Sequence, residues 1–313
     1  MAAESQAAAA VLMVRPVRFQ TNPLTAESNA FQREEPVMPA ETSQARALAE
    51  FEGLRVALQE AGVAVYAFDD TPEPHTPDSV FPNNWVSFHS DGTVVVYPME
   101  APNRRPERRR DLIEALASGH GFHVTRLIDL GHYEAAGQFL EGTGSLVLDR
   151  QRHTAYACLS SRTHLDPLAD FARRLDYDVL TFEAVDPAGR PIYHTNVMMW
   201  VAEELAAVCL EAIPGRDKRD AVLARLAEGG RQVLELRMEQ VLAFAGNMLE
   251  LRNRRGQRLI AMSEQARRSL DARQLETIES YGRIVSAPLD HIEASAGGSA
   301  RCMLAAVHLP RRS

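Results

Sequence analysis

The feature that most constrains this fold is a helix–strand unit that recurs along almost the whole chain. Amphipathic helices are predicted to begin near five positions, with spacings of 62, 59, 52 and 54 residues: Gln44, Pro106, Leu165, Asp217 and Asp271. A period of about 50–60 residues that carries the same supersecondary unit is typical of a repeat protein. We therefore expect an α/β fold built from about five similar units.

Strand segments complete each unit. A β-rich run follows each helix, and these runs are predicted to begin at Val63, Phe122, Asp178, Arg231 and Arg283. Hairpins such as WVSFHSDGTVVVYP lie between consecutive units, and the terminal segments VLMVRPVRF and CMLAAVHL complete one unit between them. Closing five units around an axis removes most exposed sheet edges. This predicts a five-bladed β/α propeller with a pseudo-fivefold repeat, as a single domain over residues 11–313 after a disordered tail of residues 1–10.

The composition excludes several classes of protein. The 313 residues include 34 Lys or Arg and 42 Asp or Glu, and the net charge of −8 argues against binding to phosphate backbones or anionic membranes. Three widely spaced cysteines fit neither a disulfide framework nor a zinc site, and no apolar run is long enough to span a membrane. P-loop and GxGxxG motifs are absent. We expect a reduced, cytoplasmic protein that needs no metal or cofactor and binds a small molecule.

Five residues occupy the same position relative to the predicted hairpins. Their spacings are 57, 53, 53 and 55 residues, and they are Asn84, Glu141, His194, Asn247 and Cys302. Equivalent positions of a closed ring converge on its axis, so a carboxylate, an imidazole and a thiol are expected to meet there. These groups suit covalent catalysis, with a thiolate nucleophile, a general acid/base and an orienting carboxylate. A single histidine is often only structural, and EGTGS is also typical of a plain glycine-rich turn, but the shared position favours a site.

The three cysteines differ in their surroundings. Cys158 and Cys209 lie inside apolar strand segments and are expected to be inert core residues. Cys302 follows GGSAR, in which Gly297 and Gly298 allow the backbone to approach a ligand closely. Cys302 is therefore the candidate nucleophile.

Four segments of the chain, in this order, resemble the guanidine-modifying, or pentein, superfamily: PDSVFPNNW, LEGTGSLVLD, YHTN and GGSARCM. This superfamily includes arginine deiminases, dimethylarginine dimethylaminohydrolases and amidinotransferases. The resemblance runs from about Val11 to Pro310 and is closest to the citrulline-utilisation hydrolase branch. The motifs are specific only when taken together. The resemblance implies a five-bladed β/α propeller, in agreement with the repeat count.

The resemblance implies catalytic roles for three residues. Cys302 matches the family's nucleophile, His194 its catalytic histidine, and Glu141 the acidic residue of its Asp/Glu-Gly-Gly motif. The chain departs from that motif, since EGTG lacks the second glycine and the acid that follows it.

The resemblance also implies substrate-binding roles. In the dimethylarginine hydrolases, positions that match Asp78 and Asn84 grip the substrate side chain. Positions that match Arg104 and Arg162 hold the substrate carboxylate, which a guanidinium can bind through two parallel hydrogen bonds. Solvated surface arginines are the alternative for these two. Asn84 replaces an acid, and Asn196 stands where deiminases carry an aspartate.

Together these features predict a cofactor-free hydrolase that cleaves a C–N bond of an arginine-like guanidino or ureido compound through a covalent thio-intermediate. The amides of Asn84 and Asn196 both donate and accept hydrogen bonds, which suits a neutral ureido group. We therefore favour citrulline over arginine, with ornithine, ammonia and carbon dioxide as products. An arginine or dimethylarginine hydrolase and an amidinotransferase remain open alternatives. A non-catalytic protein of the same fold is disfavoured because the Cys, His and Glu are all retained.

Overall fold

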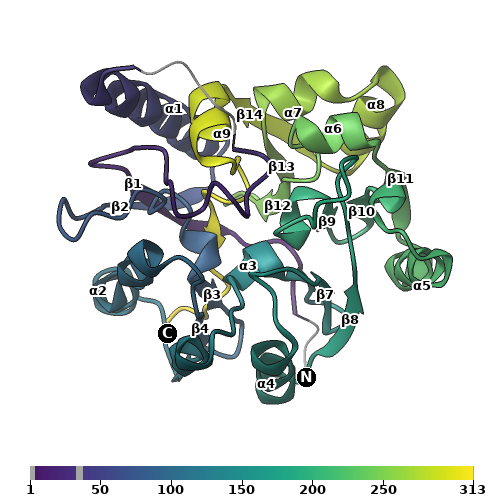
Figure 1. The fold of residues 1–313 in the computed structure, drawn as a ribbon, viewed down its shortest axis with the longest axis horizontal. Helices are drawn as coiled ribbons and strands as arrows, with labels where there is room; N and C mark the ends of the chain where they lie inside the picture. The colour runs from purple at the N-terminus through teal and green to yellow at the C-terminus, as the bar shows by residue number, and fades with distance from the viewer. Residues whose placement is uncertain (1–3, 33–37, 313) are drawn as a thin grey trace.

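The computed structural model describes residues 4–32 and 38–312 and shows an α/β fold (Figure 1). The strands of these residues form five sheets of three strands each. Every sheet has the same design, in which the central strand pairs with one neighbour antiparallel and with the other parallel. The prediction of about five similar α/β units is therefore confirmed.

The first sheet joins the two ends of the chain. Its strands, in order across the sheet, are β15 (Ala305–Ala306), β1 (Ala10–Arg15) and β2 (Ala64–Asp69). Val11 pairs with Ala306 across the antiparallel ladder. The terminal segments thus complete one unit between them, as the sequence predicted.

The other four sheets are each built from consecutive strands. They are β3 (Val86–Phe88), β4 (Thr93–Val96) and β5 (Arg126–Asp129); β6 (Val147–Asp149), β7 (Thr154–Cys158) and β8 (Asp178–Phe182); β9 (Met199–Val201), β10 (Leu205–Val208) and β11 (Gln232–Glu235); and β12 (Leu249–Arg252), β13 (Arg258–Ser263) and β14 (Arg283–Ala287).

The helices lie between these strands in the chain. They are α1 (Ala40–Glu60), α2 (Arg110–Glu114), α3 (Gly142–Ser145), α4 (Leu165–Leu175), α5 (Arg216–Ala227), α6 (Met238–Leu242), α7 (Glu264–Ser269), α8 (Ala272–Tyr281) and α9 (Asp290–Ala296). Figure 1 shows α1, α2, α4, α5 and α8 at the periphery and the short α3 near the centre.

Two predicted helix starts are confirmed, and local chemistry explains one of them. α4 begins at Leu165, as predicted, and α8 begins directly after Asp271. The Asp271 carboxylate accepts a hydrogen bond from the backbone N–H of Gln274 (2.9 Å), and the Gln274 side chain accepts one from the N–H of Asp271 (3.0 Å). This reciprocal pair is a capping box, which satisfies two donors that the first turn leaves free.

Three predicted boundaries are wrong by four residues: α1 begins at Ala40 rather than near Gln44, and the other two lie in the next unit. α2 begins at Arg110 rather than near Pro106, because Pro106 lies in a 3-10 segment, Pro102–Glu107, that precedes the helix. The strand expected from Phe122 begins at Arg126, which is the first residue to pair with β4, opposite Thr93. Phe122 instead forms an isolated bridge with Arg311.

The disordered tail predicted for residues 1–10 is wrong for the part that the structure describes; residues 1–3 lie outside the described residues. Gln6 is buried, and its side-chain amide donates hydrogen bonds to the carbonyl oxygens of Leu148 (2.9 Å) and Val201 (3.0 Å). Ala8 forms a bridge with Leu251. Apart from residues 1–3, this segment is therefore held by hydrogen bonds to three other sheets.

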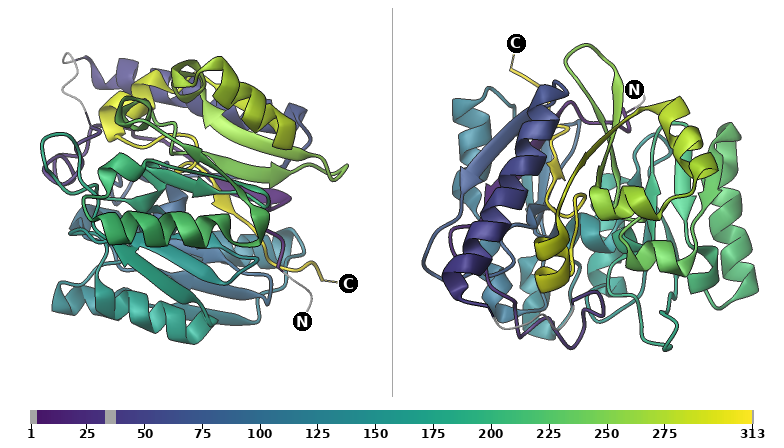
Figure 2. Two further views of the ribbon diagram at one scale, coloured as in Figure 1. Left: turned by 90° about the vertical axis from the view of Figure 1, so that its right-hand side faces the viewer. Right: turned by 90° about the horizontal axis from the view of Figure 1, so that it is seen from above.

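The five sheets surround a common centre. One cavity, which we call the axial cavity, is bounded by a strand from each sheet: β3, β6, β9, β12 and β15. Figure 2 shows both chain termini at the same end of the molecule. No helix within residues 4–32 and 38–312 is long and apolar enough to cross a membrane.

Candidate active site

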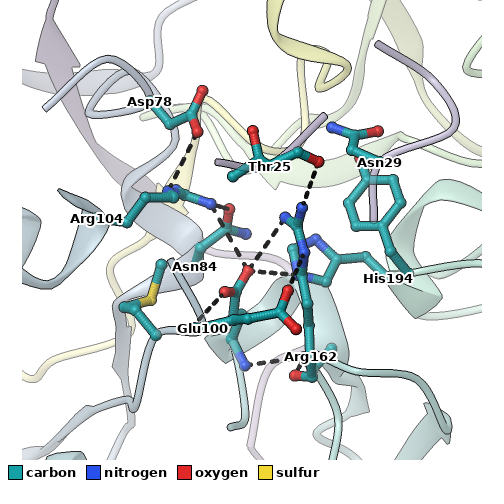
Figure 3. A network of polar contacts seen from close by, with 12 residues as sticks. Thr25, Asn29, Asp78, Asn84, Glu100, Arg104, Arg162 and His194 are labelled. Atoms are coloured by element: carbon teal, nitrogen blue, oxygen red, sulfur yellow. Dashed lines mark hydrogen bonds and ion pairs between the residues drawn. The ribbon is translucent and has the colours of Figure 1, made fainter. Parts of the chain in front are cut away.

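A small cavity, distinct from the axial cavity, gathers the residues that the sequence analysis selected. Its lining includes Asp78, Asn84, Arg104, Arg162, His194 and Cys302. Glu141 contacts His194, and Asn196 contacts Cys302. The structure therefore brings all eight predicted site residues together, and Figure 3 shows the polar network that joins many of them.

The repeat explains why these residues meet. Each of the five equivalent residues lies two to six positions before the first strand of a hairpin: Asn84 before β3, Glu141 before β6, His194 before β9, Asn247 before β12 and Cys302 before β15. Because those five strands all bound the axial cavity, the residues before them end up close together.

Two amide groups surround the thiol of Cys302. The side chain of Asn247 donates to Sγ at 3.2 Å, and that of Asn196 donates at 3.5 Å. The backbone N–H of Cys302 donates to the carbonyl oxygen of Ser299 at 3.0 Å. Cys302 is buried and forms no disulfide. Both amide N–H groups thus point at the sulfur, where hydrogen-bond donors can stabilise negative charge.

The two glycines before Cys302 are required by the protein's own packing. Gly297 ends α9 with φ = 66°, and a Cβ there would lie 2.5 Å from the Asn29 amide. A Cβ on Gly298 would lie 2.6 Å from the Phe81 ring. Asn29 and Phe81 both line the cavity. The sequence predicted that the backbone at these glycines approaches a ligand closely. In the structure, the backbone there approaches Asn29 and Phe81 of the cavity wall.

His194 and Glu141 form a buried pair, with Nε2 of His194 2.9 Å from Oε2 of Glu141. Burial lowers the pKa of His194 to about 4, although the carboxylate opposes this shift. Burial alone would raise the pKa of Glu141, but Arg162, His194 and Arg104 hold it below its ordinary value. At neutral pH Glu141 is therefore ionised and His194 neutral. Since an ionised carboxylate only accepts, the proton lies on Nε2 and leaves Nδ1 as the basic atom.

Arg104 is fully engaged with groups of the chain. It binds Glu107 through two parallel hydrogen bonds of 2.9 Å, and its Nη1 donates to Oδ1 of Asn84 at 3.0 Å. Asp78 lies 3.6 Å and Glu141 3.7 Å from its guanidinium. The alternative of a solvated surface arginine is wrong, since only 2% of Arg104 is exposed.

Arg162 is buried to the same extent, and the surface alternative is wrong for it as well. Its Nη2 donates to the Ser28 hydroxyl at 2.7 Å, and Nη1 lies 3.5 Å from Glu141. Glu100 lies 3.3 Å from its Nε, and the guanidinium stacks 4.8 Å above the Tyr193 ring. Aromatic stacking and ion pairing together fix the orientation of the guanidinium plane.

Two oxygens at the site have no hydrogen-bond partner among the described residues: Oδ1 of Asp78 and Oδ1 of Asn196. The other Asp78 oxygen accepts from the Asn22 amide at 2.7 Å. Both residues are buried, so each free oxygen is an acceptor suited to an N–H group of a bound molecule.

Several residues of the site were not predicted: Glu100, Glu107, Asn22, Asn29, Phe81 and Tyr193 supply partners or walls. Asn247 was expected at the centre but was given no role, and it supplies a donor to the thiol. A sequence signal existed for Asn247, which shares the repeat position, and for Glu107, which follows Arg104 by three residues in a 3-10 segment.

The other cysteines lie in the core, as predicted. Cys158 is in β7 and Cys209 follows β10, and burial raises the pKa of each thiol to about 12. Within the described part of the chain, no three His, Cys, Asp or Glu side chains are grouped so that they could hold a metal ion.

With this geometry established, comparison with known proteins identifies the family. The model of a family described as "N,N dimethylarginine dimethylhydrolase, eukaryotic" matches residues 15–309. The chain belongs to this family. The dimethylarginine dimethylhydrolases are C–N hydrolases of the pentein superfamily, so the resemblance seen in the motifs is confirmed. The comparison with curated proteins gives no match.

Solved structures show the same fold at low sequence identity. The N-terminal domain of ArgZ, covalently bound to a reaction intermediate, is 20% identical with a TM-score of 0.71, and the match covers 96% of this chain and 99% of that one. ArgZ is described as an arginine dihydrolase from cyanobacteria. AgrE with L-arginine is 20% identical with a TM-score of 0.73, covering 97% of this chain and 41% of AgrE.

A dimethylarginine dimethylaminohydrolase with an S-methyl-L-thiocitrulline adduct is 15% identical with a TM-score of 0.63, covering 94% of this chain and 98% of that one. The chain spans about two fifths of the full ArgZ and AgrE chains. These likenesses establish the fold.

Proposed function

We propose that this protein is a cysteine-dependent hydrolase that cleaves a C–N bond of an arginine-like guanidino or ureido amino acid, without a cofactor. The observation that carries this proposal is the convergence of Cys302, the His194–Glu141 pair and two buried arginines around one cavity. The printed descriptions of the related structures name arginine and a thiocitrulline as the small molecules they bind, which supports this substrate class.

The first half of the reaction forms a covalent intermediate. The Cys302 thiol gives up its proton, and Sγ attacks the central carbon of the guanidino or ureido group. The tetrahedral adduct collapses when a nitrogen leaves with a proton, as ammonia or an amine. His194, neutral at rest with a basic Nδ1, takes up a proton and delivers it to this leaving nitrogen.

In the second half, water hydrolyses the thio-intermediate. With citrulline as substrate, loss of ammonia gives a thiocarbamate on Cys302. Nδ1 of His194 accepts a proton from the attacking water, which releases the thiol and an N-carboxy-ornithine that loses carbon dioxide. The ionised Glu141 keeps the proton on Nε2 throughout and stabilises the imidazolium that forms transiently.

Substrate binding is assigned to five further residues. We assign the substrate side chain to Asp78, Asn84 and Asn196, and its carboxylate to Arg104 and Arg162. The free oxygens of Asp78 and Asn196 support the first assignment, since both can accept from N–H groups. Because Arg104 already binds Glu107, its share of the carboxylate requires that some of its present contacts rearrange.

We propose citrulline as the preferred substrate. The side chains that contact the nucleophilic sulfur, Asn196 and Asn247, are amides and carry no charge to offset a guanidinium. Arginine is the second candidate, and the half-buried carboxylate of Glu100 favours it, since it adds negative charge beside Asp78 and Glu141.

The remaining parts of the proposal concern the whole chain. We propose that the five sheets are the blades of a five-bladed β/α propeller and that residues 11–313 act as one catalytic domain. A cytoplasmic location is proposed because all three cysteines are free.

A substrate panel tests the function. Purified protein is incubated with citrulline, arginine, methylarginines and agmatine, and ornithine, ammonia, amine and carbon dioxide are measured. The expected result is ornithine, ammonia and carbon dioxide from citrulline, with no requirement for an amine acceptor. A kcat/KM for arginine at least tenfold above that for citrulline would show that the charge argument is wrong. Product formation only with an added amine would identify an amidinotransferase.

A further inference from the structure

The axial cavity is a second polar space, on the side of the molecule where the termini lie. Gln6 and His308, near the two ends of the chain, line it. Arg150, Arg301 and Asn196 also border it, and no Asp or Glu of residues 4–32 and 38–312 does. It has room only for a small ion with a few water molecules.

Arg301 is the unusual group of this cavity. Its side chain makes one hydrogen bond, from Nη1 to the carbonyl oxygen of Leu304 at 2.9 Å, and within residues 4–32 and 38–312 no ion pair joins it to a carboxylate. Burial lowers the pKa of Arg301 to about 10, so it still carries its charge at neutral pH. Arg301 is half-buried, and a cation that is largely removed from water without a counter-charge is costly.

The other basic groups of the lining leave the positive charge of Arg301 without a counter-charge. Arg150 has its own partner, since its Nη1 donates to Glu4 at 2.8 Å. Burial lowers the pKa of His308, and the nearby Arg150, His89 and Arg301 lower it further, so His308 is neutral. The lining thus carries two positive charges, of which Glu4 balances one.

We infer that the axial cavity binds a small monovalent inorganic anion of the size of chloride, held by the guanidinium of Arg301. A carboxylate ligand of substrate size does not fit, whereas a halide accepts hydrogen bonds from the free N–H groups of a guanidinium and adds the missing negative charge.

The site lies directly behind the nucleophile. Asn196 borders the axial cavity and donates to Sγ of Cys302, and Asn247 accepts from the backbone N–H of Arg301 (3.0 Å) while it donates to the same sulfur. Negative charge on Cys302 raises the pKa of Arg301, so the guanidinium and a charged sulfur lie close enough to interact. An anion held by Arg301 therefore opposes formation of the thiolate.

Thermal unfolding in potassium chloride, with potassium gluconate keeping the ionic strength constant, tests the proposal. The wild-type protein should show a saturable rise in Tm of about 3 °C, since a ligand that binds only the folded state stabilises it. Arg301→Gln should abolish this rise. Arg273→Gln, which changes an exposed arginine of α8, is the control and should keep it. No rise in the wild-type protein, or the same rise in Arg301→Gln, would overturn the proposal.

A second test uses only the wild-type protein, so it holds even if Arg301→Gln does not fold. Crystals are grown in bromide. An anomalous peak within hydrogen-bond distance of the Arg301 guanidinium is expected. Bromide found only at the surface would overturn the proposal, and neither result bears on whether Cys302 is the nucleophile.

Discussion

At the scale of single residues, the chemistry rests on how buried groups share charge. Cys302 is buried beside two amide donors, and His194 is neutral because burial outweighs the nearby carboxylate. Glu141 is ionised because two arginines and the imidazole surround it. Glu141 and His194 are therefore both in the protonation state that the proposed reaction needs.

Cys302→Ser should remove turnover while the fold is retained, because an alkoxide forms far less readily than a thiolate at neutral pH. We expect kcat to fall by at least about 10³-fold, as for other residues that act as nucleophiles. Steady-state kinetics with citrulline measure this. Cys158→Ser and Cys209→Ser are the controls and should chiefly lower stability, since both lie in the core. Activity of Cys302→Ser within tenfold of wild type would refute the assignment.

The pKa of His194 makes a prediction about stability. The folded protein holds this imidazole neutral down to a pKa of about 4, whereas the unfolded chain binds a proton below about 6.5. The free energy of unfolding should therefore fall as the pH drops from about 6.5 to about 4, by about 3 kcal/mol from this group. Urea unfolding of wild type and His194→Gln measures it. The free energy of unfolding of His194→Gln should fall less steeply than that of wild type between about pH 6.5 and pH 4. If the two proteins show the same pH dependence, His194 is not held neutral by the fold.

At the scale of elements, each hairpin and its neighbouring turn must fit closely around the centre. A Cβ on Gly246, three residues before β12, would overlap the backbone oxygen of Val197 in the adjacent unit. Backbone cannot move aside as a side chain can, so close packing here depends on glycine.

Gly246→Ala should therefore lower the free energy of unfolding by about 1–3 kcal/mol. Gly53→Ala is the matched control: Gly53 lies in α1 with nothing within 4 Å of an added Cβ. It should be stabilising by up to about 1 kcal/mol, because alanine is the better helix former. Urea unfolding compares the two. An unchanged stability of Gly246→Ala would mean that the two units are not packed as described.

The elements of the repeat are also the part of the fold that the sequence predicts well. The repeat and its five equivalent residues were predictable because periodic apolar patterns mark equivalent elements. The partners Asn22 and Asn29 were not, because they lie in a segment between β1 and α1 that has no repeat and reaches the site only through tertiary folding. The charge on Arg104 is balanced by Glu107, and such local pairing depends on burial that a single sequence does not reveal.

At the scale of the whole molecule, the two ends of the chain meet. β1 and β15 share a sheet, and the N-terminal segment binds strands of other units. The equivalent residues of all five units precede strands that bound one cavity, and the thiol and the imidazole line the smaller cavity beside it. The site is thus a product of all five units rather than of one.

Gln6→Ala tests the role of the N-terminal segment. The change removes three hydrogen bonds of the Gln6 side chain: two donated to Leu148 of β6 and Val201 of β9, and one accepted from the backbone N–H of Arg150 (2.8 Å). It leaves buried carbonyl oxygens without donors, so the free energy of unfolding should fall by about 1–3 kcal/mol. Ser5→Ala, at an exposed neighbouring position, should change it by less than about 0.5 kcal/mol. Equal effects of the two changes would show that Gln6 does not tie the sheets together.

The covalent intermediate tests the central claim most directly. Protein mixed rapidly with citrulline, and in parallel with arginine, is quenched in acid, and peptide mass spectrometry locates any adduct. We predict an adduct with the mass of the substrate minus ammonia on the peptide that contains Cys302, and none on peptides that contain Cys158 or Cys209. Steady turnover with no adduct on Cys302, or with the adduct on another residue, would contradict the account.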